Sequence, residues 1–176
     1  MFSEARSFQA DIGRWDTSNV TRMHAMFDKA TSFNANIGGW DTSNVMAIDR
    51  MFHGATSFNQ DIGDWDTRNA LLMRETFEGA TAFDQDVSRW DTRNVDSMTR
   101  MFRNAASFDQ NLGDWDLSSL TSADSMLDGS GMSTAAYDAT LIGWNSAPNT
   151  ATGIGLGAQG LTYCNGADAR ADLIAN

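Results

Sequence analysis

Apolar positions in residues 1–125 recur every 25 residues, and the polar positions between them follow the same register. Three aromatic columns define the repeat, two of phenylalanine and one of tryptophan. The columns are Phe2, Phe27, Phe52, Phe77 and Phe102; Phe8, Phe33, Phe58, Phe83 and Phe108; and Trp15, Trp40, Trp65, Trp90 and Trp115. Because five units keep this register without an insertion, they predict a repeat array in which each unit packs against its neighbours.

Within one unit the apolar spacing changes from a helix-like to a strand-like pattern. Apolar side chains separated by three, four and three residues stand at Val20, Met23, Phe27 and Ala30. This spacing follows a polar stretch that suits a helix start, and it predicts a short helix over about residues 19–29. Residues 32–38 then alternate, with Phe33 and Ile37 on the inward side, and predict a short strand.

These elements predict an α/β fold: a leucine-rich-repeat-like right-handed solenoid with one short parallel strand and one short helix in each 25-residue repeat. A parallel β-helix is the structural alternative, although its coils would lack the helix-like spacing. Glycines at equivalent positions, Gly38, Gly63 and Gly113, are predicted to turn the chain after each strand, and Ser88 departs from that pattern.

The regular register fades after Leu127, which divides the domain into two parts. Residues 1–125 form the five repeats, and residues 126–176 are predicted to be a C-terminal capping segment of the same domain. In that segment we expect a helix starting at Ser133, with Tyr137, Leu141 and Trp144 on it, and a terminal helix within residues 166–176. Between them we expect a polar loop over residues 145–152 and extended pieces at 154–156 and 161–163.

Composition excludes several classes of function. The formal net charge of -11 argues against binding to nucleic acid or to an anionic membrane surface. No apolar stretch reaches the roughly 18 residues of a spanning helix, so membrane insertion is not expected. Cys164 is the only cysteine, which excludes an internal disulfide. Since Met1 and Phe2 align with Met26 and Phe27, the chain is interpreted as a segment that begins inside a repeat.

Residues able to do catalysis are few, and the chain is not expected to be an enzyme. His24 and His53 occupy non-equivalent positions of the repeat, and no histidine lies near Cys164 in the sequence. Arginines such as Arg68, Arg89 and Arg93 are scattered among acids. We therefore predict no catalytic residues.

An aspartate follows every tryptophan of the repeat. The column contains Asp16, Asp41, Asp66, Asp91 and Asp116. Stacked carboxylates repel one another unless hydrogen bonds or a cation neutralise them. One interpretation is that each accepts backbone N–H groups as an Asx turn or a helix cap. The other is a column of calcium ligands, so calcium is the one cofactor that this pattern leaves open.

A second set of polar side chains lies on the outward side of the predicted strands. The first row is Gln9, Asn34, Asn59, Asp84 and Asp109, and the second is Asp11, Asn36, Asp61, Asp86 and Asn111. On an exposed strand face these amides and carboxylates could bind sugar hydroxyls, a cation or a basic peptide. The alternative is a solvated polar face that only opposes pairing of the sheet edge with another chain.

The repeat MFxxAxSFNQDIGxWDTSNVTxM resembles that of bacterial surface proteins in the BspA-like leucine-rich-repeat group. The C-terminal sequence from AAYDATLIGW to LTYCNGADARADLI also resembles the segment that closes such arrays. The resemblance implies a secreted or cell-surface array with roles in attachment to proteins, cells or matrix. It implies no catalytic residues.

The predicted function is therefore an extracellular module for adhesion, or for protein or glycan interaction, on a bacterial cell surface. A structural spacer that binds nothing, or a calcium-binding solenoid, is the alternative. The exposed apolar end of the first repeat, with Phe2, Phe8 and Trp15, also predicts end-to-end self-association.

Overall fold

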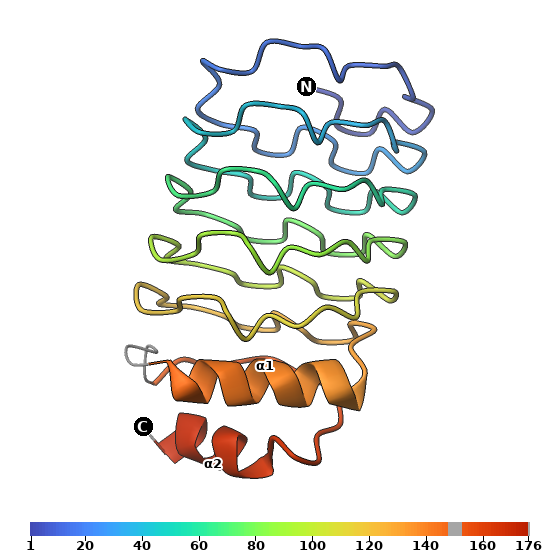
Figure 1. Cartoon of the computed structure of the whole chain (residues 1–176). Coiled ribbons are helices and arrows are strands. Elements are labelled where there is room, and N and C mark those ends of the chain that lie inside the picture. Colours follow the sequence, from blue (N-terminus) through green and yellow to red (C-terminus); the bar gives the residue numbers. More distant parts are fainter. Residues whose placement is uncertain (148–152, 176) are drawn as a thin grey trace.

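The five repeats are wound into coils that stack one above the next, with two helices closing the C-terminal end of the stack (Figure 1). The computed structural model describes residues 1–147 and 153–175. Helix α1 spans Thr134–Ser146 and helix α2 spans Ala167–Ala175. No strand is formed in these ranges, where the sheet pairing consists of isolated bridges.

Each coil is a series of tight turns whose ends are the inward-facing residues. The N–H of Met26 bonds to the carbonyl of Met23, that of Ala30 to Phe27, and that of Phe33 to Ala30, at 3.2, 3.0 and 2.9 Å. Every turn therefore returns the chain to the core after three residues. This produces the apolar spacing of three and four that resembles a helix.

The predicted leucine-rich-repeat-like solenoid, with one helix and one strand in each repeat, is wrong. Residues 19–29 form no helix, because every second N–H from Met23 to Lys29 bonds to the next coil and two of those between them close tight turns. The N–H of Met23 reaches the carbonyl of Ala47 at 2.9 Å, and that of Phe27 reaches Met51 at 2.9 Å. Ala25 and Lys29 adopt φ values of 50° and 56°, which a right-handed helix does not allow.

The predicted strand over residues 32–38 is also absent. Its inward residues, Phe33 and Ile37, are buried as expected, but turns begin or end at both of them. Parallel pairing occurs elsewhere, in single bridges that join Arg22 to Ala47 and Ala47 to Leu72, and continue in the following repeats. The register between coils was therefore predicted correctly, whereas the elements within a coil were not.

Aromatic columns fill the interior of the stack, as the sequence predicts. In the second coil Phe27 lies face to face with Phe33 at 3.7 Å between ring centroids, and the ring of Phe52 follows at 5.8 Å. The tryptophans stack in the same way and also donate hydrogen bonds between coils. The indole Nε1–H of Trp65 donates to the carbonyl of Ile37 at 3.2 Å. Burial of these rings supplies the packing energy between repeats.

The glycines lie in the predicted turns, since the N–H of Trp40 bonds to the carbonyl of Ile37 and that of Trp65 to Ile62, both at 3.1 Å, and they also serve a second purpose. A Cβ at Gly38 would lie 2.5 Å from the carbonyl oxygen of Asp61 in the next coil, and one at Gly63 would lie 2.6 Å from that of Asp86. Neither residue is among the glycines with positive φ. Close approach of two backbones, not conformational freedom, selects glycine at this position.

Both predicted C-terminal helices are present. The hydroxyl of Ser133 caps α1 by accepting the N–H of Ala136 at 3.2 Å. The indole of Trp144 donates to the carbonyl of Leu112 at 2.8 Å, the same bond that the tryptophans of the second to fifth repeats make to the coil before them. Helix α1 thus takes the place of a further coil and covers the apolar end of the stack (Figure 1).

The chain after α1 returns to the last coil. Leu156 forms a parallel bridge with Ala123, and the N–H of Leu127 bonds to the carbonyl of Gly157 at 2.8 Å. Of the extended pieces predicted at 154–156 and 161–163, only the first forms a bridge. The loop predicted over residues 145–152 begins later than expected, since α1 continues through Ser146, and its residues 148–152 lie outside the described part of the chain.

Candidate functional site

The first predicted binding row connects neighbouring coils. In three of its members the side-chain oxygen accepts the backbone N–H of the equivalent residue one coil on. Asn34 accepts from Asn59 at 2.9 Å, Asn59 accepts from Asp84 at 3.0 Å, and Asp84 accepts from Asp109 at 2.9 Å. Asp109 continues the series to Ser133 at 2.6 Å. These side chains hold neighbouring coils together, and Gln9 is exposed at the start of the row.

The second predicted row is exposed and forms Asx turns. Asp11, Asn36, Asp61, Asp86 and Asn111 each accept the N–H of the residue two positions on, at 2.9 to 3.0 Å. The hydrogen bond from the backbone of Ser88 is the main cause that lowers the pKa of Asp86 below its usual value of 3.8. One oxygen of each side chain therefore makes a hydrogen bond within its own turn. This turn precedes the position where the backbone contacts the next coil.

The aspartates that follow the tryptophans make the same turn. Asp16, Asp41, Asp66, Asp91 and Asp116 accept the N–H two residues on, at 2.9 to 3.3 Å. Hydrogen bonds from the serine two residues on lower the pKa of Asp16, Asp41 and Asp116. The Asx-turn interpretation is confirmed, while the helix-cap interpretation is wrong because no helix follows. Each carboxylate keeps one oxygen outside this bond.

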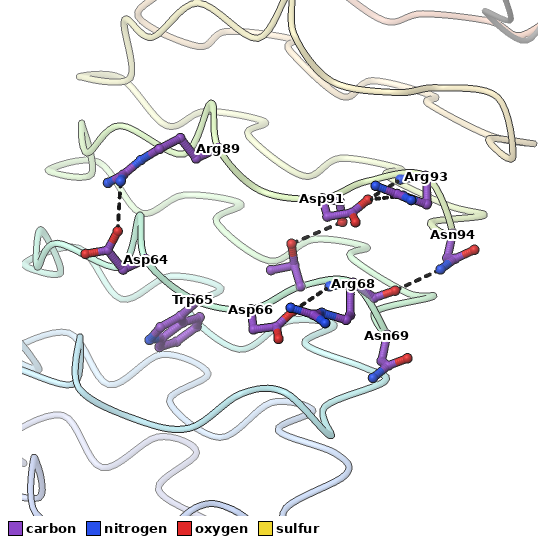
Figure 2. Close-up of a pocket in the computed structure, with 10 residues that line it drawn as sticks. Asp64, Trp65, Asp66, Arg68, Asn69, Arg89, Asp91, Arg93 and Asn94 are labelled. Carbon is purple, nitrogen blue, oxygen red and sulfur yellow. Dashed lines mark hydrogen bonds and ion pairs between the residues drawn. The ribbon is translucent and has the colours of Figure 1, made fainter.

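A groove lies on the outer surface where the third and fourth repeats meet (Figure 2). Its volume is about 660 Å³, and arginines and aspartates from both repeats line it. Arg68 and Arg93 come from equivalent positions of two consecutive coils, where the other repeats carry serine. The groove is therefore a local departure from the regular surface.

The arginines of the groove are held by aspartates through only part of their hydrogen-bonding capacity. Arg68 Nε donates to Asp66 Oδ1 at 2.9 Å, and Arg93 Nε donates to Asp91 Oδ1 at 2.8 Å. The bond from Asp91 raises the pKa of Arg93, which stays protonated. In the described ranges the terminal nitrogens of Arg68 and Arg93 have no protein partner. They are also exposed, with 69% and 66% of each side chain accessible.

A third arginine borders the groove from the opposite side. Arg89 Nη1 lies 2.9 Å from Asp64 Oδ1, and Figure 2 shows this pair apart from the two stacked arginines. Guanidinium groups with free terminal N–H groups bind carboxylate, sulfate and phosphate oxygens in a paired geometry. The groove can therefore bind an anionic group that bridges two coils.

Sequence reasoning missed this groove because the arginines were judged singly, as cations scattered among acids. The informative pattern was the change from WDTSN to WDTRN in two consecutive repeats. Since equivalent positions of adjacent repeats stack, that change already places the two guanidinium groups on the same side.

The chain belongs to the family described as "Mycoplasma protein of unknown function, DUF285", whose model matches residues 1–73 and 36–144. It is a repeat protein of that family. No curated protein and no solved structure matches the chain. In the described residues, no helix is long and apolar enough to cross a membrane.

Proposed function

We propose that this chain is an interaction module of a bacterial surface protein and that it binds acidic glycans through the groove of Arg68, Arg89 and Arg93. One observation carries this proposal: two consecutive repeats replace serine by arginine and present unpaired terminal guanidinium nitrogens to a common groove. The resemblance of the repeat to BspA-like surface proteins supports an attachment role at the cell surface, and the family match supports only the repeat architecture.

The geometry also determines the kind of ligand. Coils repeat at the spacing of backbone pairing, about 4.8 Å, so the guanidinium groups of Arg68 and Arg93 suit a carboxylate or sulfate that contacts both. Because the chain carries a net charge of -11, long-range attraction of a polyanion is not expected. Recognition must come from short-range paired hydrogen bonds, which favours a uronic-acid or sulfated sugar unit over a uniformly charged polymer.

The test is a binding screen of the full chain on immobilised uronate and sulfated glycans, with calcium and with chelator. The double substitution Arg68→Ser and Arg93→Ser restores the serine of the other repeats. We expect it to weaken binding about tenfold for each arginine, since a hydrogen bond to a charged group contributes roughly 1.5–3 kcal/mol. The matched control, Arg14→Ser with Arg22→Ser, removes the same charge from exposed positions outside the groove and is expected to bind like the unchanged protein.

Three outcomes would contradict the proposal. Equal losses in both double variants would show that only net charge matters. Binding that requires calcium would instead favour the column of aspartates that follow the tryptophans. Absence of binding across the panel would favour the spacer function.

The exposed rings of the first coil support self-association as a further property. Trp15 is 43% exposed, whereas Trp40 in the next coil is 4% exposed, and Phe2 and Phe8 are only half-buried. We expect the chain to form dimers through this face at high concentration and Trp15→Ser to weaken them. Light scattering over a concentration series measures this, and a strict monomer at the highest concentration would contradict it.

A further inference from the structure

One edge of the stack carries a row of unlike charged side chains, on the opposite part of the repeat from the tryptophan–aspartate pairs. Asp28, His53, Glu78 and Arg103 occupy equivalent positions of consecutive repeats. Their side chains follow one another along the stack, and Glu75 joins them from the end of the third repeat, three residues before Glu78. Regular repeats would place the same residue at each level, so this row is another departure from the regular pattern.

His53 is fixed in one orientation by a buried carboxylate. Its Nδ1 lies 2.6 Å from Asp28 Oδ1, and Asp28 is only 8% exposed. Arg50 holds the other oxygen of Asp28 at 3.3 Å and keeps the carboxylate in place. Nδ1 also lies 3.3 Å from Arg50 Nη2, but its shorter contact is to the carboxylate, which only accepts hydrogen bonds, so we assign the proton to Nδ1 and the lone pair to Nε2. A carboxylate that orients a histidine in this way is the usual partner of a metal-binding imidazole.

Two further carboxylates, those of Glu75 and Glu78, lie near His53. One ligand atom each from His53, Glu75 and Glu78 can be chosen so that all three lie within 4.8 Å of one another. Bonds of about 2.0–2.2 Å in a tetrahedral zinc site require separations of about 3.4 Å, so the three side chains must move closer together when an ion binds. The three side chains are 21%, 23% and 13% exposed, which leaves the cluster open to ions from solvent.

Neighbouring arginines neutralise the carboxylates without using all of their oxygens. Arg50 Nη1 lies 3.1 Å from Glu75 Oε2, and Arg103 Nη1 lies 3.1 Å from Glu78 Oε1. Arg100 is more distant, at 4.0 Å from Glu75 Oε1. Glu75 Oε1 and Glu78 Oε2 lie outside the two close ion pairs, so each carboxylate has an oxygen to offer a metal ion.

We propose that His53, Glu75 and Glu78 bind a divalent transition-metal ion, zinc in the first place, with Asp28 as the positioning residue for His53. One imidazole and two carboxylates are a ligand set that zinc accepts, with water in the remaining position. The bound ion would join the third and fourth coils at the edge of the stack and stabilise them against separation. This site is independent of the glycan groove and of its function.

The test is calorimetric titration of the full chain with zinc ions alone, in a Cys164→Ser background because the exposed thiol could bind zinc by itself. We expect one ion for each chain, loss of binding in His53→Gln, and affinity reduced about 10- to 100-fold in Asp28→Asn. The matched control is His24→Gln, which changes the only other histidine and is expected to bind zinc normally.

A second measurement covers the case in which a variant fails to fold. In the Cys164→Ser chain, which retains both histidines, zinc is expected to shift the imidazole NMR resonances of His53. The resonances of His24 are expected to stay unchanged. Equal shifts of both rings, no saturable binding, or unchanged binding by a folded His53→Gln would overturn the proposal. The row would then be a metal-free ladder of ion pairs.

Discussion

Replacing Phe77 by alanine is expected to lower the free energy of unfolding by about 3–5 kcal/mol, the cost of truncating a fully buried phenylalanine. Phe77 has no exposed surface and lies in the centre of the stack. Its ring packs against Phe83 at 4.0 Å within its own coil, and against Phe52 and Phe102 at 5.5 and 5.4 Å in the coils on either side. Alanine would remove contacts to three coils at once.

The measurement is urea unfolding followed by circular dichroism. Phe2→Ala is the matched control, since Phe2 occupies the same column but is only half-buried in the first coil. Its loss is expected to be markedly smaller. In a stack where each repeat contacts only its neighbours, Phe77→Ala is also expected to separate unfolding into two transitions. Equal destabilisation by the two substitutions would contradict the packing described here.

Asp138→Asn is expected to lower the melting temperature by several degrees at neutral pH and to flatten the acid sensitivity of the protein. Asp138 lies on α1 and is 5% exposed. Its carboxylate accepts the N–H groups of Cys164, Asn165 and Gly166 at 2.9, 2.8 and 2.9 Å, which connects α1 to the start of α2. Asparagine offers one acceptor oxygen and no charge, so it can satisfy only part of this set.

The direction of the pH effect follows from the pKa of Asp138. Burial by itself would raise it, but the three N–H groups outweigh burial and hold the pKa below its ordinary value of 3.8. A carboxyl group with a lowered folded-state pKa stabilises the fold fully above its unfolded pKa. This contribution is lost as the pH falls through the folded pKa. The loss is therefore expected below about pH 4.

Thermal melts from pH 7 to pH 2.5 measure this effect. The substituted chain should retain the part of the acid sensitivity that comes from other carboxyl groups with lowered pKa, such as Asp86 and Asp116. Asp114→Asn serves as the control because Asp114 is exposed. If Asp138→Asn and Asp114→Asn showed the same pH profile, the carboxylate would not be the connection between the two helices.

The sequence predicted the interior well and the hydrogen bonding poorly. Aromatic columns at a fixed spacing require each ring to pack on its equivalent one repeat away, and Phe52, Phe58 and Trp65 do so. Both C-terminal helices were also predicted. The hydroxyl of Ser133 caps the first one locally, and the apolar spacing of this segment lies outside the 25-residue register. The local sequence pattern predicted a contact correctly where the contacting residue is close in the sequence or is the equivalent residue of the next repeat.

The candidate sites show what local pattern leaves out. Asn34, Asn59 and Asp84, in the first predicted binding row, each also accept a backbone N–H one coil away, which the sequence did not predict. The groove and the histidine cluster were missed for the related reason that their members lie one repeat apart. Arg68 and Arg93 become neighbours, and so do His53 and Glu78, only when the coils are stacked in register.

By itself, the sequence determined the 25-residue register, the inward aromatic columns and the helical C-terminal segment, because these depend on which residues must be removed from water. Only the tertiary structure decided that a coil is a series of turns instead of a helix and a strand. The same spacing of inward-facing residues is compatible with a series of turns and with a helix followed by a strand. The choice between them depends on whether alternate N–H groups can bond to the next coil, and that partner exists only after the repeats have stacked.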